Sequence, residues 1–395
     1  MRISKVISIL SFVLATGAVV ASAQDKPADT TQAAATQAVA PQVAPAPAPE
    51  AKAPEAKPAE VKPVGTFYGK IFADWNYDVT QNAPKTSNQK SLFELSRVYL
   101  GYNCKLNGNF TTDALLDVTR IDPLANPITS AGVADTLKVP ATPTTLAVKI
   151  NDSYIAYLKS AYLAWNGILP ATTLTFGQFG YFAFDVQESF WAHRYIYKSF
   201  MDNQSWASSA DLGAKVTVNP IDMLKITGGI TNGEGYKSTQ DAFGDYKVGG
   251  AVQFNPLKEL TLYVYGDWMP KNVTHDSSQS TIATFAGYKI LDMAKIGVEY
   301  NYQFHQGEVA KHDVMGTSIY AMYNIIKELE VFARYDYARS QDNWNSLDNQ
   351  TAIAGLQYCP ISKVKFALDY QRVIPRIYRG SVAMNKIFVN GEFDY

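Results

Sequence analysis

The chain has 395 residues, with 35 basic and 36 acidic side chains, so its formal net charge is only −1. This near-neutral balance, with no run of basic residues, argues against nucleic-acid binding. Beyond the N-terminus there is no apolar run of about 18 residues, so the sequence predicts no transmembrane helix.

The first 23 residues have the pattern of a secretion signal. Arg2 and Lys5 precede an apolar run from Val6 to Val20, and Ala21-Ser22-Ala23 fits a cleavage site. A membrane anchor helix is the alternative, but the run is short for a membrane span. We therefore expect residues 1–23 to be a signal peptide that directs export.

Residues 24–64 have a different composition from the rest of the chain. They consist mostly of Ala, Pro, Lys and Glu, with almost no large apolar side chain to bury. Such a segment cannot form a packed core, so we expect a disordered periplasmic spacer. It is interpreted either as a passive linker or as a tether that contacts the cell wall.

From residue 65 to 395, short segments alternate between apolar and polar residues at every second position. This period is typical of strands that have two different environments. In the closing segment, Ile387, Val389, Phe393 and Tyr395 lie on one face, and Lys386, Glu392 and Asp394 lie on the other. We expect about sixteen strands, near residues 66–78, 91–104, 109–120, 152–165, 171–181, 207–219, 222–231, 245–254, 259–269, 280–290, 293–305, 312–324, 328–340, 349–359, 362–373 and 383–395.

The connections between these segments are alternately tight and long. Tight turns such as 219–222 and 255–258 share an Asn-Pro start, which favours a turn. The connections 121–151, 182–206 and 232–244 are long and mostly polar. Short turns on one rim and long loops on the other are typical of outer-membrane barrels. The sequence therefore predicts an all-β, antiparallel, up-and-down transmembrane barrel in the cell outer membrane.

The number of strands carries the functional inference. Sixteen strands enclose an aqueous channel, whereas eight would be filled by side chains. We expect a porin that allows passive diffusion of small hydrophilic solutes or ions. The alternative is a structural or anchoring barrel with a narrow or closed lumen. The candidate lumen-wall residues carry both charges, which predicts weak selectivity: Lys70, Asp74, Arg97, Asp211, Lys215, Lys225, Lys247, Asp267, Lys295, Glu299, Arg334, Asp336, Lys365 and Asp369.

The segment 182–206 is too aromatic for a solvated loop. We expect it to bury its rings inside the barrel and to narrow the channel, although packing on the outer rim is the alternative. Its charged and titratable residues are the candidates for the pore constriction: Asp185, Glu188, His193, Arg194, Lys198 and Asp202.

Catalysis and metal binding have little support in the sequence. The four histidines, His193, His275, His305 and His312, lie in no recognisable catalytic motif and have no metal-ligand spacing. We expect no enzymatic activity, no cofactor and no metal. Cys104 and Cys359 fall on strands too far apart to pair, so we expect two free thiols that face lipid or the membrane interface.

Several stretches resemble Gram-negative porins of the broad phosphate-selective (porin O/P-like) group. They are GKIFADWNYD (69–78), FELSRVYLGYNCKLNGNF (93–110), WAHRYIYKSFMDNQSWASSADLGAKV (191–216), NGEGY (232–236) and FVNGEFDY (388–395). The resemblance implies a sixteen-stranded, commonly trimeric channel with a loop folded inward after the fifth strand. A phosphate-selective member would present a ladder of lumenal arginines and lysines. The expected partners are outer-membrane lipid and lipopolysaccharide, small solutes or ions, a homotrimer and, through the spacer, the cell wall.

Overall fold

The computed structural model describes residues 63–80, 90–120, 154–376 and 382–395. The expected signal peptide, nearly all of the expected spacer and the whole of the long connection 121–151 lie outside the described residues. The described residues form the strands of a barrel and most of the connections between them.

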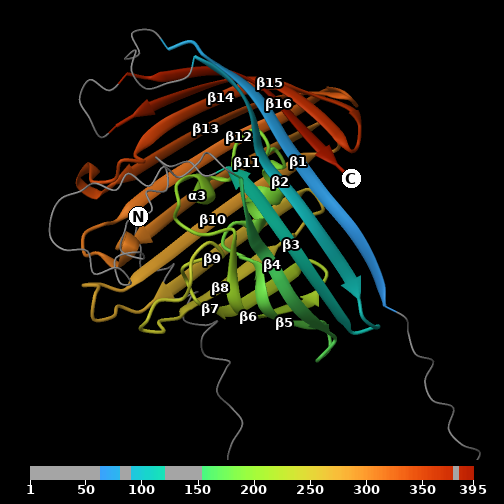
Figure 1. The fold of residues 1–395 in the computed structure, drawn as a ribbon, viewed down its shortest axis with the longest axis vertical. Coiled ribbons are helices and arrows are strands. Elements are labelled where there is room, and N and C mark those ends of the chain that lie inside the picture. Colours follow the sequence, from blue (N-terminus) through green and yellow to red (C-terminus); the bar gives the residue numbers. More distant parts are fainter. Residues whose placement is uncertain (1–62, 81–89, 121–153, 377–381) are drawn as a thin grey trace, which may run out of the picture. The chain divides into compact units, whose positions relative to one another are not determined.

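Sixteen strands form one closed antiparallel barrel (Figure 1). Each strand pairs with its neighbours in the sequence, and β1 closes the ring by pairing with β16, for example Ile71 with Phe393. The expected fold is thus confirmed. The strands are β1 (Val64–Asp78), β2 (Ser91–Lys105), β3 (Phe110–Arg120), β4 (Tyr154–Asn166), β5 (Thr172–Gly180), β6 (Ala210–Ile221), β7 (Leu224–Thr231), β8 (Lys247–Phe254), β9 (Leu260–Met269), β10 (Gln279–Ile290), β11 (Ala294–Phe304), β12 (Val314–Ile326), β13 (Leu329–Ser340), β14 (Asn349–Ile361), β15 (Val364–Pro375) and β16 (Met384–Asp394).

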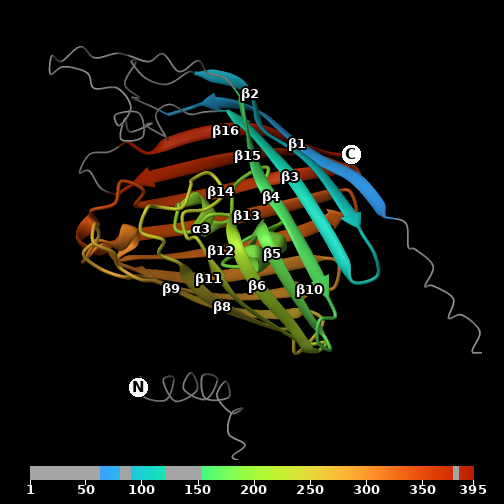
Figure 2. The ribbon, with the colours of Figure 1, turned by 60° about the horizontal axis from the view of Figure 1, so that its bottom comes forward.

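The two rims differ as the turn chemistry predicts. The turns after β6, β12 and β14 are only two residues long, whereas the connection from β5 to β6 covers residues 181–209. Figure 2 shows the strands side by side around the barrel, with the longer connections gathered at one end. No helix among the described residues has the length and apolar character needed to span a membrane.

The two faces of the strands have opposite character. On β11, Ile296, Val298 and Tyr300 are exposed on the outer surface, while Glu299 and Asn301, which alternate with them, are buried inside. A charge on the lipid side would cost about 2–4 kcal/mol at the membrane midplane, so the segregation follows from the environment.

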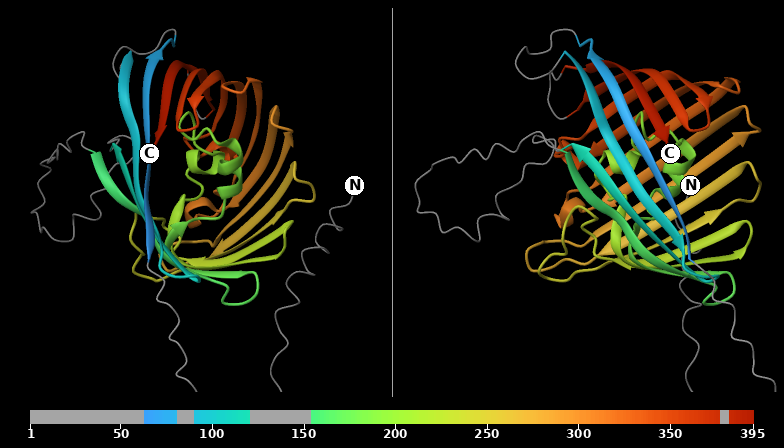
Figure 3. Two further views of the ribbon diagram at one scale, coloured as in Figure 1. Left: turned by 90° about the vertical axis from the view of Figure 1, so that its right-hand side faces the viewer. Right: turned by 45° about the vertical axis from the view of Figure 1, so that its right-hand side comes forward.

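The segment between β5 and β6, residues 181–209, is here called the inner loop. It contains two short helices, α2 (Asp185–Trp191) and α3 (Phe200–Asn203). The left view of Figure 3 looks along the barrel and shows these helices inside the ring of strands. The inner loop therefore does not pack on the outer rim, because its rings find an apolar surface on the inner wall.

Both cysteines are free, and they lie on β2 and β14 as expected. Cys104 is buried on the outer face near Tyr102. The expected placement of Cys359 was wrong, because its thiol lies close enough to Lys365, Glu330 and Glu392 to interact with these inward-facing side chains. Gln357 is buried inside the barrel and Tyr358 is exposed outside, so Cys359 follows on the inner side, where the register with β15 shifts between Tyr358 and Ile361.

Candidate channel constriction

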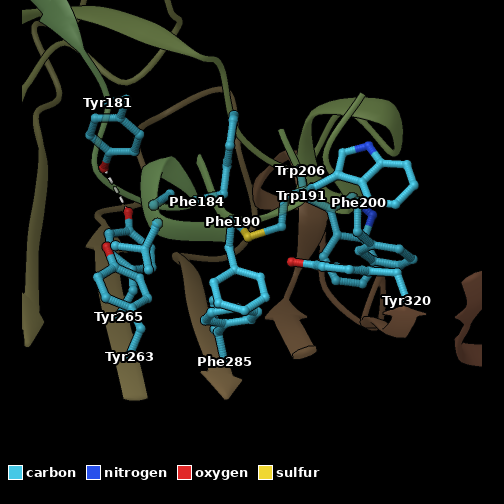
Figure 4. Close-up of a cluster of buried hydrophobic side chains, with 14 of the residues drawn as sticks. Tyr181, Phe184, Phe190, Trp191, Phe200, Trp206, Tyr263, Tyr265, Phe285 and Tyr320 are labelled. Atoms are coloured by element: carbon cyan, nitrogen blue, oxygen red, sulfur yellow. Dashed lines mark hydrogen bonds between the residues drawn. The ribbon is translucent and has the colours of Figure 1, made fainter. Parts of the chain in front are cut away.

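The buried side of the inner loop is an aromatic cluster. Phe190 packs on Phe285 with ring centroids 5.2 Å apart, and Trp191 packs on Tyr320 at 5.1 Å. Figure 4 shows these rings from the loop facing rings from the wall. Aromatic pairs in these tilted and edge-on arrangements stabilise a contact beyond the area they bury. The cluster fixes the loop against the inner face of β9 to β13.

Two wall glycines allow this close approach. A Cβ at Gly316 would lie 2.0 Å from Phe200 Cζ, and one at Gly287 would lie 2.6 Å from Phe190 Cε2. Any side chain at these positions would meet a ring, so the wall is shaped to accept the loop.

Polar side chains of the wall donate hydrogen bonds to carbonyl oxygens of the inner loop. Arg334 Nη1 donates to the carbonyl of Lys198 at 3.0 Å, and Gln303 Nε2 donates to that of Trp206 at 2.9 Å. Arg334 is also held by Asp336 through two bonds of 2.8 Å. Because loop carbonyls buried without partners would be costly, these donors make the inner position of the loop stable.

His193 belongs to the buried side of the loop. It is 2% exposed, its Nε2 lies 2.6 Å from Glu330 Oε1, and its Nδ1 lies 2.5 Å from the carbonyl oxygen of Trp191. Its ring packs on Phe332 at 5.2 Å. The structure therefore places this candidate against the wall and away from open space, since its spacing along the loop puts it among the aromatic anchors.

The opposite side of the inner loop borders open space. A compartment of about 460 Å³ lies between the end of α2 and β1, β2, β3, β15 and β16, and Lys159 of β4 also lines it. A neighbouring compartment of about 280 Å³ lies between residues 194–203 and β1, β2, β15 and β16. Both are lined by Phe72 and Arg194, so these two residues mark the boundary between them.

Charged residues gather around this boundary in what is here called the charged cluster. Arg97 pairs with Asp117 at 2.8 Å, and Arg194 pairs with Asp202 at 2.6 Å and with Glu188. Three lysines complete the cluster, which gives five cations against three carboxylates: Arg97, Lys159, Arg194, Lys198 and Lys237, with Asp117, Glu188 and Asp202.

Tyrosines hold two of these lysines. Lys159 Nζ lies 3.2 Å from Tyr99 Oη and 4.7 Å from the centroid of the same ring. Lys237 Nζ lies 4.9 Å from the Tyr157 centroid and 5.6 Å from the Tyr236 centroid. Ring faces attract cations, so these contacts hold the ammonium groups in place without neutralising them.

Two charged groups of the inner loop show what this environment does to ionisation. Burial lowers the pKa of Lys198, and Arg97 and Arg194 lower it further, although Asp202 opposes them. Burial alone would raise the pKa of Asp202, but Arg194 and Lys198 reverse this effect, and the pKa is lowered. An additional anion in this cluster would be stabilised in the same way.

The constriction candidates from the sequence separate into three locations. Glu188, Arg194 and Lys198 line the two compartments, and Asp202 contacts Arg194 beside them. Asp185 lines two further compartments, of about 600 and 300 Å³, around the start of α2. His193 is buried against the wall, as described above.

The lumen-wall candidates from the sequence also fall into three groups, according to their exposure. Six line the compartments: Lys70, Asp74, Arg97, Lys215, Lys225 and Lys365. Six are buried, several of them beneath the inner loop: Asp211, Lys247, Glu299, Arg334, Asp336 and Asp369. Lys295 and Asp267 are partly buried.

Sequence reasoning missed Lys159, Asp117 and Lys237 as members of the charged cluster. Lys159 lies at a bulge, where Leu115 pairs with Ser160 and Leu116 pairs with Leu158. The extra residue breaks the alternation that would have marked it as inward-facing. Lys237 lies on a loop, where no alternation exists.

Comparison with known proteins identifies the family and the fold. Residues 130–372 match the model of the family described as "Putative beta-barrel porin-2, OmpL-like". No curated protein matches the chain.

Three solved structures are similar over the whole barrel. They are the outer membrane channel DcaP of Acinetobacter baumannii (TM-score 0.59, 12% identity, 85% of this chain and 98% of that chain), the anion-selective porin from Comamonas acidovorans (TM-score 0.58, 11% identity, 85% and 100%) and the trimer form of OmpT from Vibrio cholerae (TM-score 0.53, 11% identity, 85% and 100%). At these identities the similarity shows the fold.

Proposed function

The chain belongs to the OmpL-like β-barrel porin family and forms a passive diffusion channel in the outer membrane, and we propose that this channel prefers anions. The preference would arise at the charged cluster, where the inner loop approaches β2, β3 and β4. The candidates on the loop are Glu188, Arg194, Lys198 and Asp202. The wall contributes Arg97, Lys159 and Asp117.

The observation that carries the proposal is the excess of cations at this level of the channel. Across the whole barrel the two charges nearly balance, yet here five cations face three carboxylates. Asp117 and Asp202 are each held by an arginine, whereas Lys159 and Lys237 are held by uncharged rings. A permeating anion therefore meets ammonium groups that retain their charge.

A narrower selectivity for phosphate is the finer form of the proposal. It is supported by the resemblance to phosphate-selective porins and by the three lysines of the charged cluster, because ammonium groups are common ligands of phosphate. Inorganic phosphate added to a chloride solution should then reduce the chloride current at millimolar concentrations.

The test is the reversal potential of the refolded protein in a planar bilayer under a KCl gradient. The wild type should prefer chloride. The triple change Lys159→Glu, Lys198→Glu and Lys237→Glu should move the preference towards potassium. The matched control is Lys271→Glu on the exposed connection after β9, which should leave the potential unchanged. A wild-type channel without anion preference would refute the proposal.

A structural barrel with a closed lumen is the second candidate, because the inner loop fills part of the interior with packed rings. Single-channel recordings separate the two functions. Stable open steps would exclude the closed barrel, and silence from correctly folded protein would favour it. We propose no enzymatic role, in keeping with membership of a porin family.

The terminal regions and the assembly are proposals of the same kind. We propose that residues 1–23 are removed as a signal peptide, which mass spectrometry of the exported protein would test by a mature start at Gln24. Residues 24–64 would form a periplasmic spacer, and deleting residues 25–62 should release the barrel from the cell wall if the spacer is a tether.

A homotrimer surrounded by lipid and lipopolysaccharide is supported by the similarity to the trimer form of OmpT, and cross-linking in membranes tests it.

A further inference from the structure

The larger of the two compartments beside the charged cluster has an unusual lining for a water-filled channel. One part of its wall is apolar or aromatic, formed by Tyr68, Phe72, Tyr99, Leu115 and Ala192. These side chains come from β1, β2, β3 and the residue that follows α2, and the strand residues among them face inward, where strands of a barrel usually carry polar residues.

Cations lie at the edges of the same compartment. Lys70 and Lys365 pair with Glu392 at 3.3 and 2.5 Å, and Arg194 pairs with Glu188. Lys159 differs from them, because the contacts of its ammonium group among the described residues are with tyrosines. It is therefore the cation of this compartment that is most available to an anion.

The charged cluster attracts a small inorganic anion by charge alone, and the apolar part of this lining adds nothing to its binding. Phosphate or chloride is strongly hydrated, and apolar side chains offer it no hydrogen bond to replace the lost water. A solute with an apolar body gains from the same surface, because it removes apolar area from water. An apolar wall beside an available ammonium group thus selects for a molecule that carries both an apolar body and a negative charge.

We propose that this compartment is a binding site for organic anions that join a carboxylate to an aromatic or cyclic aliphatic body. The carboxylate pairs with Lys159, and the body contacts Leu115, Phe72 and Tyr99. The proposal rests on the anion preference proposed above and adds a solute class to it. A volume of about 460 Å³ accommodates a single six-membered ring together with water.

The ring of Tyr99 contributes to both parts of the site. It is 7% exposed, and it packs edge-on against Phe72 with centroids 5.8 Å apart. Its hydroxyl accepts from Lys159 at 3.2 Å and from Arg97 Nη1 at 3.1 Å. One side chain therefore fixes the direction of the ammonium group and closes the apolar wall.

Blockage of single channels in KCl tests this site with the full-length refolded protein. Benzoate and cyclohexanecarboxylate should interrupt the current, with residence times about tenfold longer than that of acetate, as burial of an apolar ring implies. Benzyl alcohol, which has the ring without the charge, should cause no interruptions. Equal residence times for benzoate and acetate would overturn the proposal.

Variants locate the effect in the compartment. Leu115→Asn should shorten the benzoate residence time to nearly that of acetate, because the ring loses an apolar contact while the charge of the site stays the same. Leu115→Met keeps the wall apolar and should behave as the wild type. Lys159→Gln should shorten the residence of both carboxylates. Unchanged benzoate residence in Leu115→Asn would overturn the assignment, and Lys159→Gln provides an independent check if Leu115→Asn does not fold.

The two proposals fail in different ways. A wild type that shows no chloride preference in a KCl gradient removes the anion preference itself. A wild type that prefers chloride but holds benzoate no longer than acetate removes only the organic solute class.

Discussion

The two halves of the barrel interior use inward-facing residues in opposite ways. On β10 to β13, residues such as Phe285, Tyr320 and Phe332 are almost fully buried beneath the inner loop. On β1 to β4, Tyr99 and Lys159 face open compartments on the other side of the same loop. The first set of strands holds the loop in place, and the second borders open space on the other side of the loop.

This difference shows that period-two alternation identifies which residues point inward but not whether they contact the inner loop or open space. Arg334 and Arg97 both look like lumen-wall cations in the sequence. In the structure Arg334 is 3% exposed and binds the loop, whereas Arg97 borders a compartment. The neighbouring glycines and aromatic residues of β10 and β12 decide the outcome, because they create the surface on which the loop packs.

Removing the inner loop should have the largest effect, since it abolishes the difference between the two halves. Replacing residues 184–205 by a short Gly/Ser linker should raise single-channel conductance several-fold, because the cross-section now filled by packed rings becomes water. As a control, shortening the connection 270–278 should leave conductance unchanged. A loopless channel with wild-type conductance would show that the loop does not limit the current.

Breaking the buried ion pair should strongly destabilise the packed half. Arg334→Leu leaves Asp336 as an unpaired buried charge and removes the bond to the Lys198 carbonyl. The expected loss is about 3–5 kcal/mol in the free energy of unfolding, measured by urea titration in lipid vesicles. The double variant Arg334→Leu/Asp336→Leu should recover part of this loss, and equal losses in both would contradict a charge-based explanation.

A smaller loss of stability should follow from adding a methyl group at a single wall glycine. Gly316→Ala places a Cβ against the Phe200 ring and should cost about 1–3 kcal/mol by overpacking. Gly228→Ala is the matched control, because no atom lies within 4 Å of its Cβ position. Similar unfolding curves for the two variants would indicate that the Phe200 ring moves freely.

Much of the fold follows from the sequence alone. The sixteen strands, the short and long rims and the inward position of the aromatic segment 182–206 were all predicted from alternation, turn residues and aromatic content. These signals are local, and the membrane enforces them, because lipid accepts neither charges nor unpaired backbone groups.

The composition of the site could be predicted only in part. Arg194 and Lys198 were candidates because they lie in the aromatic segment. His193 looked equivalent, yet Glu330 and Phe332 hold it against the wall. Lys159 was hidden by a bulge, and Lys237 by its place on a loop. Which side of a loop faces the wall depends on contacts between distant segments, and one sequence does not reveal them.

The smallest expected effect is a pH dependence of selectivity in the open half. Burial lowers the pKa of both Lys198 and Lys237, so these side chains lose their charge at a less alkaline pH than an ordinary lysine. As pH rises through these lowered values, the anion preference should fall, while Arg97 and Arg194 stay charged and preserve part of it. Reversal potentials recorded between neutral pH and about pH 10 would measure the fall in anion preference, because an ordinary lysine, with a pKa near 10.4, stays mostly charged over this range.

Lys198→Arg should reduce the pH dependence, because a guanidinium group keeps its charge throughout this range. A preference that stays constant up to the alkaline limit would mean that neither lysine contributes to the field sensed by permeating ions.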